Sequence, residues 1–580
     1  MNVVGARTVR GRTASGVSGV SRDRQTGPVG RLATHGAVTE RLSRLTRDQR
    51  AAATAPPGPV LCVAPAGSGK TTTLVARVAW LVDGGVDPAT IAAITFNKRA
   101  ADELRERLDG ALAPLGREPG DLRVRTFHAL GREILRDAGV AVDRLVDRAG
   151  IVRELWPATT RAELAVLDTM FSRLKLEYGV TAAAVASDPG AGPFARAFVD
   201  YERALAARDA LDFDDLVRRS LDCLERDAGL LDRWRARCAH LLVDEVQDVD
   251  RSQLRLALLL AAPANRIFLV GDDDQSIYGW RLADVRRVLD LASLLPGLRR
   301  VDLEVNHRCP VPVVERAVRL IGRNRERFVK VIRPRPDAAG RLVLAPDAAD
   351  EPGRTARLVG AWPDDGGSCA VLARTNRELR PAVVVAMMRG LPFRAGAVTL
   401  LVDDPLIDTM LAWVARETDP RRPLLIRLGM LRGAGLADGT AGDGPHDDDG
   451  DLFSALLAWA AHYPDLAAFT AAVAATRARY AELQRDDARL VLATAHSTKG
   501  LEFDHVAVIG MDEGRFPSGR AVRAAPEPER AMEEERRLAY VAWTRARRTL
   551  TLSYDPSTPS PFLLEAFSPD ELGLDATMTR

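Results

Sequence analysis

Residues 60–75 read VLCVAPAGSGKTTTLV, and this stretch decides the fold. It predicts a buried strand at Val60–Ala64, a glycine-rich turn over residues 64–71 and a helix that follows at once. Glycines in such a turn let successive backbone N–H groups point at phosphate oxygens, and the helix N-terminus adds the positive end of its dipole. The order of strand, Gly-Ser-Gly-Lys-Thr and helix predicts a phosphate-binding loop in an α/β domain, although Ala64 stands where the usual pattern has glycine.

The loop and a pair of acids further along give the first candidate residues. Lys70 has the position that reaches the β- and γ-phosphates of a nucleotide, and Thr71 the position that ligates Mg²⁺. After a later apolar run, Asp244 would hold the metal through water and Glu245 would act as general base. Two acids at a strand end are common, so their assignment depends on pairing with the loop. The backbone cradle would be formed by Ala66, Gly67, Ser68, Gly69 and Thr72.

Short apolar runs like the first one recur in two series, with helical patterns between them. Continuous apolar runs are typical of parallel strands that helices cover on both faces. We therefore predict two α/β domains with parallel sheets. The first series predicts strands at Val60–Ala64, Ile91–Thr95, Val124–Phe127, Leu241–Asp244, Ile267–Gly271 and Val301–Val305. The second predicts strands at Cys369–Arg374, Leu490–Ala495, Val506–Met511 and Leu550–Tyr554.

Each α/β domain is interrupted by a stretch with helical patterns alone. The expected division is a disordered basic tail at 1–38, a first core at 39–128 and 239–300, a helical insertion at 129–238, a second core at 301–397 and 489–580 with a short tail, and a second helical insertion at 398–488. The basic tail also resembles a transit peptide but lacks an amphipathic helix, and it could precede the true start codon.

The second insertion contains an acidic loop, residues 438–451, with six aspartates. Its spacing does not match a calcium-binding loop, because Pro445 and Leu456 stand where two of the ligands should be. We therefore expect a solvated linker.

Composition narrows the class of protein further. Apolar residues make up 46% of the chain and charged residues 28%, which excludes a mainly disordered chain and a fibrous one. No run of 18 apolar residues is present, so no membrane association is expected. The five scattered cysteines, without a CxxC pair, indicate a reducing cytoplasm and no structural zinc.

The basic residues are unusual in type. The formal net charge is only +2, yet of the 81 basic residues five are lysines, at positions 70, 98, 175, 330 and 499. GC-rich codon usage explains a surplus of arginine. In such a chain a lysine indicates a place where a compact ammonium is required.

Seven boxes along the chain resemble the motifs of superfamily 1 helicases of the UvrD/Rep/PcrA type, and they occur in the family's order. The match is most specific in DEVQD (244–248) and VGDDDQSIYGWR (270–281). The others are TFNKRAA (95–101), TFH (126–128), LEVNHR (303–308), HSTKGLEF (496–503) and EERRLAYVAWTRA (534–546). The resemblance implies two RecA-like motor domains that bind ATP and Mg²⁺ in the cleft between them.

The resemblance also implies roles for residues of both cores. Arg308 and Arg545 would contact the γ-phosphate as arginine fingers, and Gln275 would sense that phosphate and couple it to DNA. Glu502, with Gly500 nearby, would contact the ribose. Gln49 would read the adenine edge, although Thr46 and Gln49 also have the spacing of a helix capping box. His307 stands where the family usually has a tyrosine that stacks on adenine.

Aromatic and basic residues at strand ends of the first core predict a track for single-stranded DNA, because stacking and backbone charge bind single strands without sequence preference. By resemblance Trp280 stacks on a base and Phe96 lines a base pocket. Further contacts would come from Lys98, Arg99, Thr126, His128, Tyr278, Arg281 and His496.

The implied activity is that of an ATP-dependent, DNA-stimulated helicase or translocase that moves 3′→5′ on single-stranded DNA or single-strand/duplex junctions. Its setting would be bacterial DNA repair or recombination, in the cytoplasm at the nucleoid, with a repair-protein partner. The second insertion is shorter than is usual in the family, which favours an alternative: a translocase that displaces proteins and unwinds little duplex. A nucleotide-gated DNA-binding protein is another alternative, against which Glu245, Gln275 and Arg545 argue.

Overall fold

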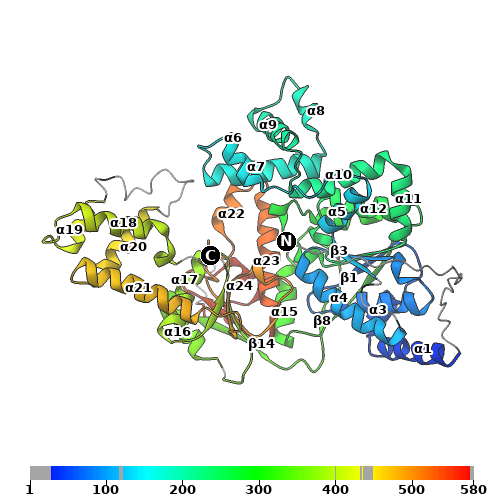
Figure 1. The fold of residues 1–580 in the computed structure, drawn as a ribbon. Helices are drawn as coiled ribbons and strands as arrows, with labels where there is room; N and C mark the ends of the chain where they lie inside the picture. The colour runs from blue at the N-terminus through cyan, green and yellow to red at the C-terminus, as the bar shows by residue number, and fades with distance from the viewer. Residues whose placement is uncertain are drawn as a thin grey trace, which may run out of the picture.

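The computed structural model describes residues 28–574, apart from residues 117–119, 121, 350, 363, 397, 399, 432–433 and 435–448. Two α/β cores lie side by side, and a group of helices projects from each (Figure 1). Residues 148–207 form a lobe at the top of the view, and the described part of residues 405–483 extends to the left. Within the described residues, no helix combines the length and apolar character that crossing a membrane requires.

The first core is built on a sheet of six parallel strands in the order β3-β2-β4-β5-β1-β6. Alternate residues of its strands face two hydrophobic clusters, one beneath helices α3 (Lys70–Asp83) and α4 (Lys98–Leu112), the other beneath α5 (Phe127–Asp137), α10 (Phe213–Arg226) and α12 (Arg251–Ala261). This double cover explains the continuous apolar runs. The strands are β1 (Val60–Val63), β2 (Ile91–Thr95), β3 (Arg123–Thr126), β4 (His240–Val243), β5 (Ile267–Gly271) and β6 (Arg299–Asp302).

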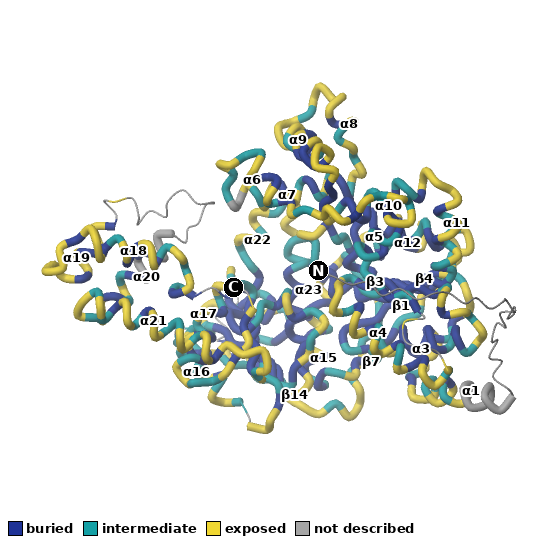
Figure 2. The backbone as a smooth tube through the Cα atoms, in the orientation of Figure 1, coloured by how far each residue is buried: buried dark blue, intermediate teal, exposed yellow. Residues whose placement is uncertain are grey.

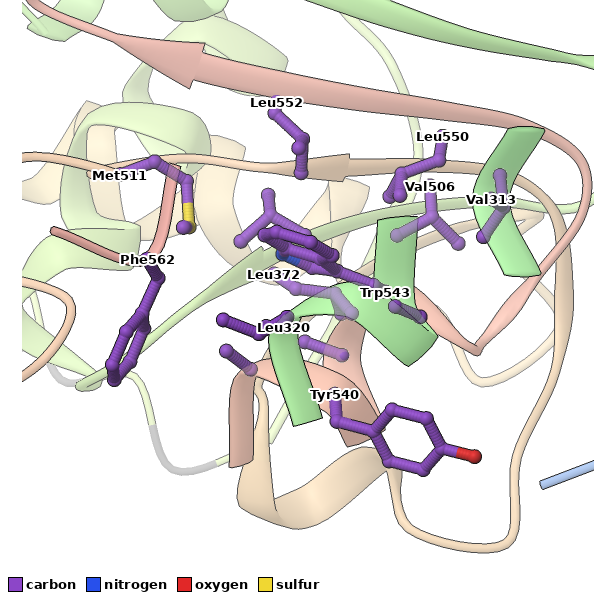
Figure 3. Packing of buried hydrophobic residues seen from close by; sticks show 14 of the residues in the cluster. Val313, Leu320, Leu372, Val506, Met511, Tyr540, Trp543, Leu550, Leu552 and Phe562 are labelled. Carbon is purple, nitrogen blue, oxygen red and sulfur yellow. The ribbon is translucent and has the colours of Figure 1, made fainter. Parts of the chain in front are cut away.

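The second core repeats this architecture with six parallel strands in the order β11-β12-β10-β13-β14-β9. Trp543 and Tyr540 lie in the cluster between its sheet and the helices α15 (Val311–Ile321), α23 (Pro528–Trp543) and α24 (Pro561–Ala566) (Figure 3). Helices α16 (Glu351–Gly360) and α17 (Arg380–Met388) cover the other face. The strands are β9 (Arg341–Pro346), β10 (Cys369–Ala373), β11 (Phe393–Ala395), β12 (Leu490–Thr494), β13 (Phe503–Val508) and β14 (Ala546–Tyr554).

The first helical insertion is smaller as a separate unit than the expected range 129–238. Its own hydrophobic cluster lies among α6 (Arg148–Leu155), α7 (Arg161–Ser172), α8 (Ala182–Ala186) and α9 (Pro193–Ala207). Helices α5, α10 and α11 (Ala228–Arg237) instead pack against the first sheet. An amphipathic helix shows the same periodicity whether it covers a sheet or another helix, so the sequence pattern cannot separate the two cases.

The second insertion has a hydrophobic cluster of its own in α18 (Pro405–Glu417), α19 (Leu424–Gly429), α20 (Asp449–Ala460) and α21 (Leu466–Leu483). Its helices are more exposed than the two cores (Figure 2). Most of the acidic loop 438–451 lies outside the described residues, and its last three residues begin α20.

Three other expectations need correction. Residues 28–38, assigned to the disordered tail, begin helix α1 (Pro28–Ser43), in which Val38 is buried; residues 1–27 lie outside the described part. The boundary expected between residues 300 and 301 falls inside β6, which belongs to the first sheet. Strands β9 and β11 were not predicted, because β9 is half-exposed and β11 has only three residues.

Candidate functional site

The carboxyl edge of the first sheet gathers the predicted residues. Strands β4, β5 and β1 are neighbours, so the segments that follow them, with Glu245, Gln275 and Lys70, meet at one half of this edge. Strands β2 and β3 end at the other half, where Phe96 and Thr126 lie. In an open parallel sheet this edge is where ligands bind, and here it offers a polar half and an aromatic half.

The phosphate loop has the backbone shape that the sequence predicts. Gly67 and Gly69 have φ angles of 71° and 85°, which side chains disfavour. A Cβ on Gly67 would lie 2.8 Å from the Asn306 Oδ1 atom. This position therefore also needs glycine because the segment with Asn306 and Arg308 packs closely against the loop. Ala64 has no positive φ, and its N–H bonds to the Gly271 carbonyl at 2.8 Å. Alanine at this position therefore extends β1 without distorting the loop.

Lys70 and Glu245 form an ion pair of 3.1 Å across this half of the site. Burial acts to raise the pKa of Glu245, but the charges of Lys70 and Lys499 and the hydrogen bonds from Gln247 and Lys70 together hold the pKa below its ordinary value. Glu245 has a left-handed backbone with φ 53°, and Gln247 donates to its carboxylate. The carboxylate predicted to act as base is thus ionised, and in its predicted role Lys70 would leave this ion pair to reach a phosphate.

The donors near the loop suit Mg²⁺ that is shared with phosphate. Asp244 is half-buried at the end of β4, and burial together with the Glu245 charge raises its pKa. Among the described residues there is no cluster of three or more His, Cys, Asp or Glu side chains able to hold a metal alone. Mg²⁺ is usually bound by one or two carboxylates plus substrate phosphates, so Asp244 with the hydroxyl of Thr71 and the loop fits such an ion.

Gln49 does form the capping box. Its Oε1 accepts from the Thr46 N–H at 3.1 Å, and its Nε2 donates to the Ser68 carbonyl at 2.8 Å. Both ends of the amide are therefore engaged, one with the helix start and one with the phosphate loop. The His307 side chain is exposed beside the same loop, and the backbone N–H of His307 donates to the Gly67 carbonyl at 2.9 Å.

The two expected arginine fingers are both held by the second core. The Arg308 guanidinium pairs with Glu502 at 2.7 Å and donates to the Thr544 carbonyl at 3.1 Å. Arg545 is 1% exposed, and its guanidinium donates to the Gln275 Oε1 atom at 3.4 Å across the cleft. Glu502, expected at the ribose, thus holds Arg308. Gly500 has φ 85° and lies two residues before it.

Lys499, which lies in the sequence box HSTKGLEF (496–503) and was given no role from the sequence, makes contacts between the cores. Its ammonium, on the second core, donates to Asp248 at 2.5 Å and to the Gln275 carbonyl at 2.6 Å. Both partners belong to the first core. In the sequence, the scarcity of lysine was what marked Lys499. The structure adds that its ammonium joins the two cores at the candidate ATP site.

The aromatic half of the edge forms a cleft of about 600 Å³ that reaches the base of the first insertion. Phe96 stacks on Tyr278 with ring centroids 5.1 Å apart, and Trp280 is 58% exposed. Arg281 lies 4.6 Å from the centroid of the Trp280 ring. Six of the predicted DNA contacts line this cleft: Phe96, Lys98, Thr126, His128, Trp280 and Arg281.

Not all predicted contacts are equally placed. Arg99, Tyr278 and His496 do not line this cleft. Arg99 pairs with Glu103 at 3.0 Å, and Tyr278 stacks on Phe96. Burial and the nearby Arg374 lower the pKa of His496 to about 4. The Thr126 hydroxyl lines the cleft but caps helix α5.

Phe213 was missed. It is 55% exposed, lines the cleft and stacks on His128 at 3.9 Å. In the sequence it stands among acids at a helix start, which gives no signal of stacking.

Comparisons with known proteins find similarity to helicases over most of the chain. Residues 45–296 match the family model of the UvrD/REP helicase N-terminal domain, and residues 459–557 match that of the UvrD-like helicase C-terminal domain. DNA helicase II of Escherichia coli (strain K12) is 28% identical over 628 aligned positions, which cover 89% of this chain and 85% of that protein.

Two further relatives cover similar shares. ATP-dependent DNA helicase Rep of the same strain is 27% identical over 639 aligned positions, covering 90% of this chain and 94% of that protein. ATP-dependent DNA helicase UvrD1 of Mycobacterium tuberculosis (strain ATCC 25618 / H37Rv) is 28% identical over 644 positions, covering 88% of this chain and 82% of that protein.

Proposed function

The chain belongs to the UvrD/Rep family of helicases, and on that premise we propose that it is an ATP-dependent DNA helicase, a motor that converts ATP hydrolysis into movement along single-stranded DNA. The observation that carries the proposal is the contact between the cores at the candidate ATP site. Arg545 and Lys499 of the second core both bond to Gln275 of the first. A change at the γ-phosphate that moves Gln275 would therefore change contacts of both cores.

The chemistry follows from the residues around the loop. The loop amides and Lys70 bind the triphosphate, and Glu245 takes the proton of the water that attacks the γ-phosphorus as the bond to the bridging oxygen breaks. Arg308 and Arg545 stabilise the charge that develops on the transferred group. Mg²⁺, held by Thr71 and Asp244, would neutralise phosphate charge when bound. Gln49 and His307 would face the base, and Glu502 the ribose.

Single-stranded DNA is the proposed track substrate, bound along the cleft with Phe96, Trp280 and Arg281. The support is a run of aromatic rings in contact at the edge of the core that also carries the nucleotide site: Phe96 stacks on Tyr278, and Tyr278 meets Trp280 edge-on. Movement 3′→5′, a role in repair or recombination, and a repair-protein partner are proposals that rest on the family. So is a place in the bacterial cytoplasm at the nucleoid.

The Trp280→Ala variant should weaken binding of single-stranded DNA by about 1–3 kcal/mol, because one base loses its stacking partner. Movement should uncouple from hydrolysis, while the ATPase without DNA is largely kept. Oligonucleotide binding and translocation assays measure this. Phe194→Ala is the matched control, since Phe194 is 49% exposed on α9 and does not line the cleft. Unchanged affinity and movement in Trp280→Ala would place the ring outside the track.

The experiment that tests the function is strand separation under single-turnover conditions, on 3′-tailed and 5′-tailed duplexes, beside DNA-stimulated ATPase. We expect ATP turnover stimulated by single strands, preference for the 3′ tail, and weak unwinding by the monomer. The expected weakness rests on the second insertion, which is shorter than is usual in the family. Fast, complete separation by the monomer would contradict this weakness. DNA binding without stimulated turnover would favour the nucleotide-gated binding protein.

A further inference from the structure

A segment between the cores has charges that the proposed mechanism does not use. Residues 324–331, which we call the strap, connect helix α15 of the second core to the short strand β8 (Arg333–Pro334). Strand β8 pairs with β7 (Val305–Asn306), just before Arg308. The strap therefore leads directly into a strand that pairs just before the predicted finger Arg308.

The first half of the strap is fixed to helix α23 of the second core. The Asn324 side chain donates to the Glu533 carbonyl at 3.0 Å, and the Arg325 N–H donates to the Glu533 carboxylate at 2.8 Å. Arg537 donates to the Glu326 carbonyl at 2.7 Å. Any movement of α23 is thus passed to the strap.

The second half enters the first core at the end of β5. Arg327 forms two hydrogen bonds with Asp274, at 2.9 and 2.7 Å, and the Phe328 N–H donates to Asp273 at 2.8 Å. The Phe328 ring packs against the hydrophobic cluster of the first core. The strap is therefore bound to both cores at once.

Lys330 is the centre of this contact. Its ammonium lies 2.9 Å from both Asp272 and Asp274 and also bonds to Asp273, and all four side chains are 0% exposed. An ammonium with three donors on a point charge suits three converging carboxylates, which the planar fork of arginine does not. This accounts for one of the five lysines in a chain whose cations are otherwise arginine.

A buried charge cluster of this kind is weak evidence for a stabilising role, since apolar residues of similar volume often stabilise as well. Its contact with the candidate ATP site gives it another role. One oxygen of Asp272 bonds to Lys330, and the other accepts the hydrogen bond of the Gln275 side-chain amide at 2.6 Å. With its amide nitrogen so fixed, Gln275 presents its oxygen to Arg545.

We propose that Lys330 is a positioning residue for Gln275: the ammonium fixes Asp272, Asp272 orients the Gln275 amide, and the strap makes that orientation depend on the position of α23. The inference rests on the proposed role of Gln275 as γ-phosphate sensor. It adds a second route, besides Arg545, by which the position of the second core sets the state of the sensor.

The test uses the full chain and the DNA-stimulated ATPase. Lys330→Met alone leaves three buried carboxylates against Arg327, so it is combined with Asp273→Asn, which restores the net charge of the cluster. Asp273→Asn alone is the matched control. The Asp273 carboxylate bonds to Lys330 and to the Phe328 N–H, and it does not contact Gln275. We expect kcat of the double variant to be about 10- to 100-fold below that of Asp273→Asn, with the KM for ATP, affinity for single strands and Tm close to the control.

The double-mutant cycle separates positioning from general damage. If Lys330 acts through Gln275, adding Gln275→Ala to the double variant lowers kcat no further than Gln275→Ala alone. The inference would be overturned if the double variant kept the kcat of Asp273→Asn while Gln275→Ala was impaired. It would also be overturned if the kcat losses of the double variant and of Gln275→Ala were additive. Full stimulated turnover in Gln275→Ala would instead overturn the sensor role itself.

Discussion

Replacement of Glu245 by glutamine is expected to lower DNA-stimulated ATP turnover by about 10²- to 10⁴-fold while ATP still binds. The glutamine keeps the shape and the hydrogen bond from Gln247 but cannot accept a proton from water. Loss of the Lys70–Glu245 ion pair also frees the ammonium, so nucleotide affinity should be equal to wild type or tighter. Steady-state ATPase and equilibrium binding of a fluorescent nucleotide measure the two effects separately.

Two further variants make this result specific. Lys70→Ala should lose both affinity and turnover, because it removes the cation that faces the phosphates and leaves Glu245 in place. Glu304→Gln is the matched control: Glu304 is a partly exposed acid after a strand of the same sheet, paired with Arg333 at 3.4 Å. Near wild-type turnover in Glu245→Gln would mean that another group acts as the base.

What the sequence predicted well are features that a short stretch contains in full. The backbone shape of the phosphate loop, the place of Asp244 and Glu245 at the end of β4, and most of the buried strands each depend on a few consecutive residues; the roles of these residues stay predictions. The placing of Phe96 and Trp280 in one cleft also followed, because both come just after parallel strands whose ends share an edge.

What the sequence did not predict are pairings between distant residues. Lys330 meets Asp272 across 58 positions, and Lys499 meets Asp248 across 251, with no periodicity to mark either pair. The abundance of arginine singled out these lysines as places that need an ammonium, and the structure supplies their partners. Two other lysines also have carboxylate partners far away in the sequence: Lys70 pairs with Glu245, and Lys175 is buried between Asp212 and Asp215 at 2.9 and 3.0 Å.

The arginine fingers give the second large effect. Arg545→Ala is expected to lower turnover by about 10³- to 10⁵-fold, the range in which a finger contributes to phosphoryl transfer. The guanidinium is already oriented by the Val541 and Leu501 carbonyls, at 2.8 and 3.1 Å, so little reorganisation is needed when the cores close. Burial, with Arg308 nearby, lowers its pKa, and a γ-phosphate would supply the countercharge that the site lacks.

Arg547→Ala is the control for Arg545→Ala, because Arg547 lies two residues on, is 41% exposed and pairs with Glu502 and Asp504. It should keep most of the turnover. Arg308→Ala should resemble Arg545→Ala and also release Glu502, so its KM for ATP should change as well. ATPase with and without single-stranded DNA, together with Tm, distinguishes these outcomes. If Arg545→Ala lost turnover only in proportion to a fall in Tm, the guanidinium would be a packing element and the cores would need another finger, for which Arg308 is the remaining candidate.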